Sequence, residues 1–347
     1  MTISYFMRNI ITILKYLIVF LCSIFCFGQS DSVRISNGDH MVGEILKMDK
    51  GVLFLDADYG DSEFKINWDE VKSLRTNRSF LILLSNGNRI HFDSIHYEKV
   101  DHSFILKNEH NYILGDSIEI VFLRPVEEKF VSRFDATISA GYNYTKSTSL
   151  KQLSISATST YNSKYWSGES EFSYVLNSQH QVDDTHRIDL DTKFSYHLDK
   201  NYFLFYGLKF LSVSEMNLNL RITNKVGIGR YFIRNNSMYF AGGLGVVWNN
   251  ENYNLEEKFS RNSGEFLANV ELNYFNIDNL TLLARLNSYP SFTEKSRFRL
   301  DLNLDAKYDL PLDFFIKLSY KYNYDSKPLE TTLKDDYILQ TSIGWEF

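Results

Sequence analysis

The 347-residue sequence predicts an all-β chain: an antiparallel transmembrane β-barrel of about twelve strands, preceded by a small soluble β domain of two repeated units. Three observations predict this fold. Apolar and polar residues alternate from Phe134 to Phe347, which gives each strand one apolar and one polar face. Aromatic residues make up 16% of the chain and there are four prolines, a composition typical of strands. No run of about eighteen apolar residues follows the N-terminal segment, so no later transmembrane helix is expected.

Residues 1–29 are predicted to be a signal peptide, because Arg8 and Lys15 flank an apolar run that is short for a membrane-spanning helix. A retained N-terminal anchor is the alternative. Both cysteines of the chain, Cys22 and Cys26, lie in this segment. The mature chain would therefore have no disulfide, no catalytic thiolate and no cysteine-bound metal.

Residues 30–125 are predicted to be a small β domain, because short strands there are separated by turn sequences. The turn Ser36-Asn37-Gly38 recurs as Ser85-Asn86-Gly87, which predicts two tandem small barrels. With Gly43-Glu44-Ile45 after the first turn, the segment resembles the Sm-like or SH3-like barrels of some envelope proteins. The resemblance implies binding of a peptide, a protein or a cell-wall component. The alternative is a spacer that packs on itself.

A short linker, residues 126–133, separates this domain from the predicted barrel, residues 134–347. Each predicted strand is long enough to cross the apolar layer of a membrane. An even number of strands lets both ends of the barrel lie in the periplasm. The expected strands are 134–146, 150–162, 164–177, 184–198, 202–215, 218–233, 237–249, 264–276, 279–290, 296–309, 312–325 and 335–347.

The lengths of the connections test this strand count, because such barrels alternate short periplasmic turns with longer outer loops. Every second connection is short and rich in turn residues: 162–164, 198–201, 234–236, 276–279 and 310–311. The connections between them are longer and polar, and include 177–184, 250–263, 291–295 and 326–334. The alternation predicts a closed barrel with a defined orientation. The alternative is a soluble β-sandwich.

The polar faces of the predicted strands carry charges of both signs, which would line the lumen. The basic residues are Arg187, Lys193, Lys209, Arg285, Arg297, Arg299, Lys307, Lys317 and Lys321. The acidic residues are Glu169, Glu171, Asp189, Asp191, Glu271, Asp301, Asp305 and Glu346. Because unpaired charges away from bulk water are costly, this near balance favours a lumen closed by its own ion pairs. A candidate basic cluster of Arg285, Arg297, Arg299 and Lys317 keeps open the alternative of a pore for anionic solutes.

Enzyme motifs are absent from the sequence: it has no Gly-x-Ser-x-Gly, no His-Glu-x-x-His and no phosphate-binding loop. We therefore expect no catalytic residue, no metal site and no cofactor. Some twelve-stranded outer-membrane barrels are phospholipases with a His–Ser pair on the outer face, and His186 and His197 are the histidines that would serve one. The net charge of −6 argues against nucleic acid as a partner.

The end of the chain carries three segments with a recognisable pattern: Tyr322–Pro328, Lys334–Tyr337 and Gly344–Phe347. Together with the glycine-rich strand Val226–Phe232, they resemble the salt-induced outer-membrane protein family, also called YdiY-like, a family of unknown function. The resemblance covers residues 134–347. It implies an outer-membrane barrel, and no enzymatic activity is established for the family. The tandem head, residues 30–125, lies outside this resemblance and is an addition to the shorter members of the family.

These observations predict a non-enzymatic barrel in the outer membrane of a Gram-negative bacterium, with its N-terminal head in the periplasm, serving envelope integrity or adaptation to salt and osmotic stress. A diffusion channel for small anionic solutes and an outer-membrane lipid-modifying enzyme are the alternatives. The expected partners are outer-membrane lipid, a periplasmic protein or cell-wall partner of the head, and the outer-membrane assembly machinery. The assembly machinery would bind the C-terminal strand, where Trp345 and Phe347 resemble the aromatic assembly signal of such barrels.

Overall fold

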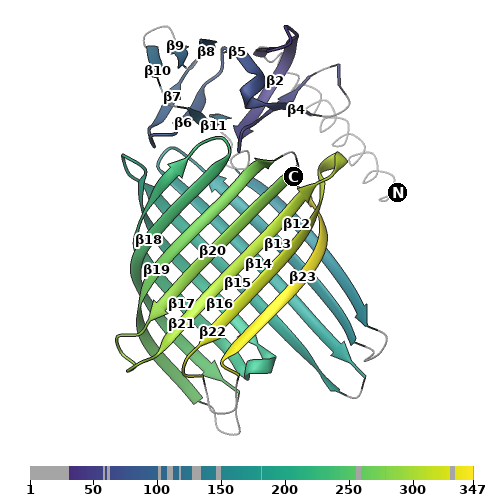
Figure 1. Cartoon of the computed structure of the whole chain (residues 1–347), viewed down its shortest axis with the longest axis vertical. Coiled ribbons are helices and arrows are strands. Elements are labelled where there is room, and N and C mark those ends of the chain that lie inside the picture. The colour runs from purple at the N-terminus through teal and green to yellow at the C-terminus, as the bar shows by residue number, and fades with distance from the viewer. Residues whose placement is uncertain are drawn as a thin grey trace, which may run out of the picture.

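The computed structural model places a small β domain, the head, against one end of a long β-barrel (Figure 1). It describes residues 31–346 except 58, 61–62, 101–102, 108–111, 117–118, 127–133, 146–149, 181, 255–258, 278 and 329–332. The expected signal peptide, most of the expected linker and Phe347 lie outside the described residues. No helix among the described residues is long and apolar enough to cross a membrane.

Twelve antiparallel strands form the barrel, and the sheet closes where the first strand pairs with the last. The strands are β12 (Phe134–Thr145), β13 (Leu150–Asn162), β14 (Trp166–Gln179), β15 (Val182–His197), β16 (Tyr202–Val213), β17 (Leu218–Arg234), β18 (Met238–Tyr253), β19 (Phe259–Ile277), β20 (Leu280–Pro290), β21 (Phe298–Asp309), β22 (Phe314–Asp325) and β23 (Asp335–Glu346). The 3-10 turns Ser214–Met216 and Pro311–Asp313 connect β16 to β17 and β21 to β22. The predicted barrel of twelve strands is confirmed.

β18 and β19 extend furthest beyond their predicted limits. The sequence predicts a loop at 250–263, but β18 and β19 stay paired out to Tyr253 and Phe259. Backbone pairing in an antiparallel ladder does not depend on apolar side chains, so polar residues continue these strands. Asn250 and Asn262, for example, are hydrogen-bonded across the pair at 2.7 Å. The prediction ended the strands where the apolar alternation fades, which is earlier than the pairing ends.

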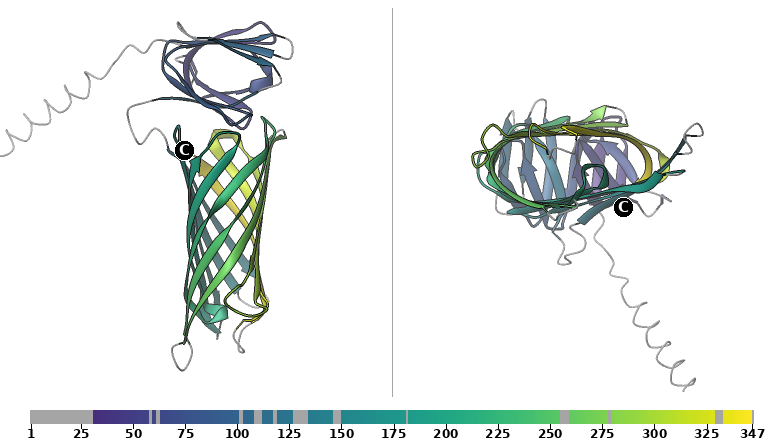
Figure 2. Two further views of the ribbon diagram at one scale, coloured as in Figure 1. Left: turned by 90° about the vertical axis from the view of Figure 1, so that its left-hand side faces the viewer. Right: turned by 90° about the horizontal axis from the view of Figure 1, so that it is seen from below.

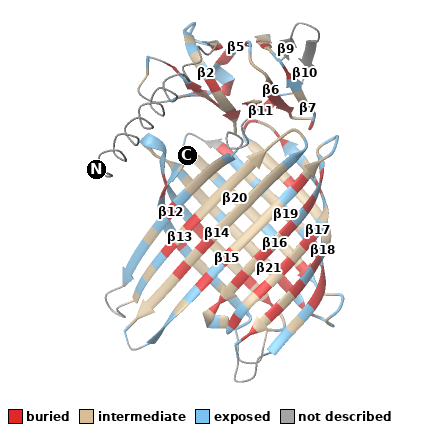
Figure 3. Cartoon of the chain, turned by 180° about the vertical axis from the view of Figure 1, so that it is seen from behind, coloured by how far each residue is buried: buried red, intermediate tan, exposed pale blue. Residues whose placement is uncertain are grey.

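Burial alternates along the barrel strands (Figure 3), because side chains point in turn to the outer surface and to the lumen, as the sequence predicts. On β22, Phe314, Ile316 and Leu318 are between 44% and 46% exposed on the outside. Phe315 and Ser319 of the same strand point inward and are 3% and 5% exposed. The outer surface of the barrel is therefore rich in apolar side chains, as a surface in contact with lipid must be.

One wall of the lumen is apolar. Phe203 and Phe205 of β16 point inward and are 4% and 8% exposed. Their rings lie against Gly229 and Gly227 of β17, where a Cβ atom would come within 2.3 Å of the Phe203 ring and 2.6 Å of the Phe205 ring. Glycine is needed at both positions because a larger side chain would collide with a ring. Seen along its axis, the barrel is an elongated ring rather than a circle (Figure 2).

Eleven short strands form the head in a single sheet. They are β1 (Asp31–Ile35), β2 (His40–Asp49), β3 (Val52–Asp56), β4 (Phe64–Asn67), β5 (Val71–Thr76), β6 (Phe80–Leu84), β7 (Arg89–Phe92), β8 (Ile95–Val100), β9 (Ser103–Lys107), β10 (Tyr112–Asp116) and β11 (Ile120–Pro125). A 3-10 turn, Trp68–Glu70, links β4 to β5. The expected small β domain is present, and the first and second repeats begin with β1 and β6.

The two repeats are interleaved in this sheet and do not close as two separate barrels. β2 of the first repeat pairs with β11 of the second, and β5 of the first pairs with β8 of the second. Val33, Ile45 and Leu74 pack in the same buried cluster as Ile82 and Ile120. A unit of roughly 45 residues buries little apolar surface by itself, so sharing one core stabilises both repeats.

The head contacts the short turns of the barrel, and the two parts stack end to end (Figure 2). Asn201 Nδ2 donates a hydrogen bond to the carbonyl of Ser85 at 2.8 Å, and Asn236 Nδ2 donates to that of Ile120 at 3.1 Å. Three ion pairs add to the contact: Lys47 with Asp135 at 2.6 Å, Arg124 with Asp135 at 2.7 Å and Lys65 with Asp313 at 2.8 Å. The short connections that the sequence predicts therefore have a structural role, because they form the surface on which the head docks.

The two Ser-Asn-Gly turns of the head differ in their surroundings. Gly38 and Gly87 both have a positive φ, +95° and +93°, which glycine adopts without strain. Nothing lies within 4 Å of the place where a Cβ of Gly38 would be. A Cβ on Gly87 would lie 2.5 Å from the backbone nitrogen of Asn201 in the barrel. The second turn is thus a close contact between head and barrel.

Candidate functional site in the barrel lumen

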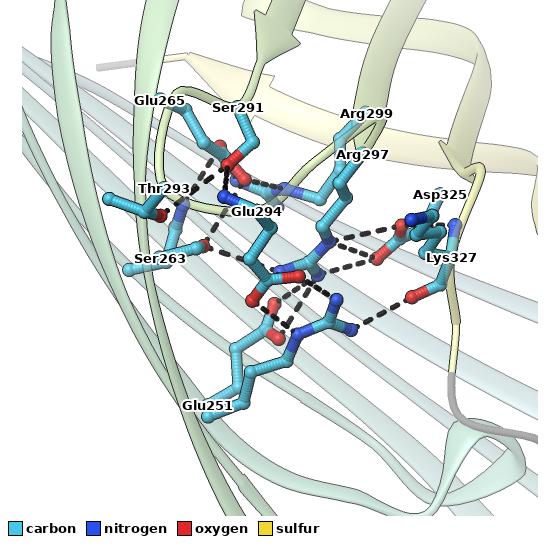
Figure 4. A network of polar contacts seen from close by, with 12 residues as sticks. Glu251, Ser263, Glu265, Ser291, Thr293, Glu294, Arg297, Arg299, Asp325 and Lys327 are labelled. Atoms are coloured by element: carbon cyan, nitrogen blue, oxygen red, sulfur yellow. Dashed lines mark hydrogen bonds and ion pairs between the residues drawn. The ribbon is translucent and has the colours of Figure 1, made fainter.

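At the end of the lumen far from the head, charged side chains fill the interior (Figure 4). Arg297, in the connection between β20 and β21, is 2% exposed and lies between two carboxylates. Its Nη2 is 3.0 Å from Glu251 Oε1 and 2.5 Å from Asp325 Oδ2. Its Nη1 donates to Ser263 Oγ at 3.3 Å, and its Nε donates to Asp325. All three nitrogens of this buried guanidinium therefore have acceptors.

Three more arginines surround Arg297. Arg299 Nη2 lies 2.6 Å from Glu265 Oε2, Arg221 Nε lies 2.7 Å from Glu251 Oε1, and Arg261 pairs with Glu294. We name the whole group the distal network: Arg221, Arg261, Arg297, Arg299, Glu251, Glu265, Glu294 and Asp325. Four positive charges face four negative charges. The cavity beside the network measures about 20 Å³, which is room for about one water molecule.

Further ion pairs cross the middle of the lumen. Lys321 Nζ of β22 lies 2.9 Å from Glu171 Oε1 of β14, and Arg187 of β15 lies 2.5 Å from Asp336 of β23. These strands are not neighbours in the sheet, so both contacts span the lumen. Other pairs are Lys193 with Glu169 and Glu271, Lys209 with Asp189 and Asp301, Lys225 with Asp191, Arg285 with Glu271, and Lys307 with Asp309 and Glu346. Most charged residues that were predicted to line the lumen are therefore paired, but Lys317 and Asp305 form no ion pair among the described residues.

At the head end, the lumen holds a cavity of about 390 Å³, which we name the proximal cavity. Leu83, Arg89 and Phe122 of the head line it from one side, and the barrel lines the rest. Phe203, Phe205 and Tyr239 belong to its aromatic wall, and the remaining lining is mixed, with apolar side chains such as Leu267 and charged ones such as Glu171. A small molecule with both apolar and polar groups would fit a cavity of this size and lining.

Two arginines at the proximal cavity form no ion pair among the described residues. Arg234 is 8% exposed, stacks 3.5 Å from the centre of the Tyr231 ring and donates to Asn201 Oδ1 at 3.2 Å. Arg89 donates to the carbonyl of Ser163 at 2.7 Å. The Nε atom of each arginine is buried without a hydrogen-bond partner. Burial, and then the nearby charge of Arg234, lower the pKa of the Arg89 guanidinium to about 10.

The four residues of the candidate basic cluster are not brought together. Arg297 and Arg299 belong to the distal network, whereas Arg285 and Lys317 line the proximal cavity. A strand rises by about 3.4 Å per residue, so residues at different heights on adjacent strands lie far apart. Side chains that all point into the lumen therefore need not form a cluster. Each of the three arginines has a carboxylate partner. The four residues of the candidate basic cluster therefore lie in two different parts of the lumen.

Sequence reasoning missed Arg89 and Arg234, which lie in the head and in the barrel. No alternation pattern connects them, because they meet only when the two parts dock. One signal was present: Arg234 begins the predicted short connection 234–236, and the predicted orientation places that connection at the periplasmic end. Glu251 and Arg261 were also missed, because both fall in the segment predicted as a loop.

The two histidines of β15, which the sequence suggested for an enzyme, each contact a serine. His186 Nδ1 is 3.0 Å from Ser214 Oγ, which also accepts a bond from the His186 backbone N–H at 3.1 Å. His197 Nε2 is 2.9 Å from Ser167 Oγ, and both residues line the proximal cavity. Among the described contacts, neither histidine has the third, orienting group of a catalytic triad. The described residues also contain no group of three or more His, Cys, Asp or Glu that could hold a metal ion.

Of the two residues in the expected assembly signal, Trp345 is described. It is 44% exposed on the outer surface of β23, which is the strand that closes the barrel against β12.

A closed antiparallel barrel with an even number of strands, an apolar exterior and short turns at one end is a β-barrel of the outer-membrane type. Residues 135–347 match the model of a family described as "Protein of unknown function, DUF481". The match covers more than half of the chain, which therefore belongs to the DUF481 family. The head lies outside the matched segment.

Solved structures with a similar fold include porins and autotransporter barrels. A NanC porin structure is 9% identical, with coverage of 61% of this chain and 97% of that chain and a TM-score of 0.36. The translocator domain of the autotransporter NalP from Neisseria meningitidis is 11% identical, with coverage of 62% and 87% and a TM-score of 0.34. The beta domain of the Bordetella autotransporter BrkA is 11% identical, with coverage of 62% and 97% and a TM-score of 0.32. No curated protein matches the sequence.

Proposed function

We propose that this protein is a non-enzymatic barrel of the Gram-negative outer membrane whose lumen is closed at rest, and that it serves envelope integrity or adaptation to salt and osmotic stress. The observation that carries the closed state is the distal network, where Arg297 is buried between Glu251 and Asp325. The apolar exterior supports the membrane location. The stress role and the salt-induced branch of the family rest on the sequence resemblance.

The head is proposed to lie in the periplasm. It docks on the short turns, through Asn201 and Asn236 among others, and bacterial barrels place their short turns on the periplasmic side. The distal network then lies near the outer surface. A periplasmic protein or a cell-wall component remains the proposed partner of the head.

Two measurements on the purified full chain test this proposal. A folded outer-membrane barrel is expected to change its mobility on gels when it is heated, and the protein should fractionate with the outer membrane. In planar lipid bilayers we expect no steady conductance, because oppositely charged side chains cross the lumen. A soluble periplasmic protein, or an open channel of stable conductance in the wild type, would contradict the proposal.

A diffusion channel for small anionic solutes is the second candidate, and the proximal cavity with Arg89 and Arg234 favours it. In that case the distal network would be a gate. Changing Arg297 and Arg299 to Ser should then alter the conductance of the wild type and its preference for anions. A conductance that is absent, or unchanged by both substitutions, counts against the channel.

A lipid-modifying enzyme is the third candidate, and the contact between His186 and Ser214 favours it. Hydrolysis of phospholipid or lipopolysaccharide that is lost on His186→Ala would support this activity. His197→Ala, which changes the His–Ser contact inside the lumen, is the matched control. No hydrolysis by the wild type would rule out the candidate.

The C-terminal strand is proposed to carry the assembly signal. Phe347→Ala should lower the amount of barrel inserted in the membrane more than it lowers the stability of the inserted barrel. Quantitative membrane fractionation measures the first effect and urea unfolding the second. Insertion of Phe347→Ala at the wild-type level would remove this role.

A further inference from the structure

Two arginines that line the proximal cavity, the buried Arg234 and the half-buried Arg89, form no ion pair among the described residues. Arg89 extends from β7 of the head and Arg234 ends β17 of the barrel, so the two arginines meet at the cavity only because the head is docked. The acceptors that they have are neutral, the carbonyl of Ser163 and the amide oxygen of Asn201. Asp49 also lines the cavity, but it forms no ion pair with either arginine.

Other cations of the lumen are paired in a different way. Arg285 and Lys321 each have a carboxylate oxygen at 2.9 Å, and Lys225 has one at 3.0 Å. Arg89 and Arg234 lie close together, and after burial the charge of Arg234 contributes to lowering the pKa of the Arg89 guanidinium. Like charges that are shielded from water are unfavourable without an anion, so an anion placed beside these two arginines is stabilised, away from the carboxylates that line the rest of the cavity.

The geometry leaves hydrogen-bond donors for such an anion. The Nε atoms of both arginines are buried without a partner. The stacking of Arg234 on the Tyr231 ring fixes the plane of its guanidinium and leaves the N–H groups at its edge for acceptors. Phosphate and carboxylate groups match the planar fork of donors that an arginine presents.

The rest of the cavity sets the size and character of the ligand. Its volume of about 390 Å³ suits a small molecule. Phe203, Phe205 and Tyr239 offer an aromatic surface against which a ring can pack. The barrel wall separates this surface from the lipid outside, which favours a free solute over a lipid headgroup.

We propose that the proximal cavity is a binding site for a small oxyanion, a phosphate monoester or a carboxylate joined to a ring, held by Arg89 and Arg234 with its ring against the aromatic wall. Because both arginines are needed, the ligand also bridges the head to the barrel. This site does not depend on whether the barrel conducts ions.

Calorimetry on the full chain in a neutral alkyl maltoside tests the site, with phenyl phosphate as the probe at low salt. We expect saturable binding that is weaker for inorganic phosphate and absent for benzyl alcohol. Arg89→Gln and Arg234→Gln should each weaken the binding of phenyl phosphate at least about tenfold, since one charge-assisted fork is lost. Arg230→Gln is the matched control, because Arg230 lies on the same strand but is exposed and stacks on Tyr202 instead.

Hydrogen exchange of the wild type gives a second readout that needs no variant. Phenyl phosphate should slow exchange in the turns around Gly87 and Asn201, where the head meets the barrel. The proposal is overturned if phenyl phosphate does not bind at about 10 mM, if the double variant at Arg89 and Arg234 binds as the wild type does, or if Arg230→Gln weakens binding equally. Tighter binding of dihexanoyl phosphatidic acid than of phenyl phosphate would replace the free solute with a lipid headgroup. None of these outcomes depends on conductance, so they are distinct from a failure of the closed-barrel proposal.

Discussion

The two ends of the lumen bury arginine in different ways. At the distal end, Arg297 lies between Glu251 and Asp325, beside a cavity of about 20 Å³. At the head end, Arg89 and Arg234 have neutral acceptors and face a cavity of about 390 Å³. A buried cation needs an anion. At the distal end the anions are carboxylates of the protein, and their ion pairs plug the lumen. At the head end there is space for an anion from outside, so the proximal cavity is a candidate binding site.

The largest expected effect breaks the plug. Arg297→Met leaves Glu251 and Asp325 buried without their shared cation, and we expect a loss of about 3–5 kcal/mol in the free energy of unfolding. Urea unfolding of the full chain in lipid vesicles, followed by tryptophan fluorescence, measures it. Arg230→Met removes an exposed arginine and should cost less than about 1 kcal/mol. Equal stability of both variants would mean that the distal network does not balance buried charge.

The next effect concerns the contact that forms the proximal cavity. Gly87→Ala combines strain at a positive φ with a clash against Asn201, for which we expect a cost of about 2 kcal/mol. Gly38→Ala has nearly the same φ but open space, so it should cost about 1 kcal/mol and leave docking intact. Hydrogen exchange at residues 198–201 measures docking. Faster exchange in both variants alike would show that the clash is irrelevant.

Removing an arginine that has no carboxylate partner should change the stability much less than removing Arg297. Arg234→Gln removes a cation that has no anion, so without ligand we expect a change in unfolding free energy within about 1 kcal/mol, or a slight gain. The same unfolding assay in phosphate-free buffer measures it. A loss as large as that of Arg297→Met would mean that Arg234 already has a compensating charge.

The smallest expected effect is at the exposed edge of the junction. Lys65 and Asp313 form an ion pair of 2.8 Å, but both side chains are 47% exposed. Solvent and salt screen such a pair, so Lys65→Ala should change the unfolding free energy by less than about 0.5 kcal/mol. Repeating the measurement in high salt should remove even this difference. An effect comparable to that of Gly87→Ala would contradict the view that buried contacts hold the head.

The barrel was predictable because its determinants are local. Alternation along the strand identifies Phe314 and Ile316 as outward and Phe315 as inward, and the lengths of the connections identify the end that carries the short turns. The interleaving of the head repeats was not predictable, because the pairing of β2 with β11 joins segments far apart in sequence. The proximal site was missed for the same reason: Arg89 and Arg234 meet through docking of two parts, which no local pattern encodes.

The shared core of the head imposes an order on how the protein is made. In the first repeat, β2 pairs with β11 and β5 pairs with β8, so neither pairing can form until the second repeat is present. β11 is the last strand before the barrel begins. A chain growing from its N-terminus therefore holds an incomplete sheet with open edges until residue 125 has emerged. During that interval the cluster around Val33, Ile45 and Leu74 lacks its members from the end of the second repeat, such as Ile120 and Leu123. A chaperone that shields strand edges would act on this protein before its first barrel strand arrives.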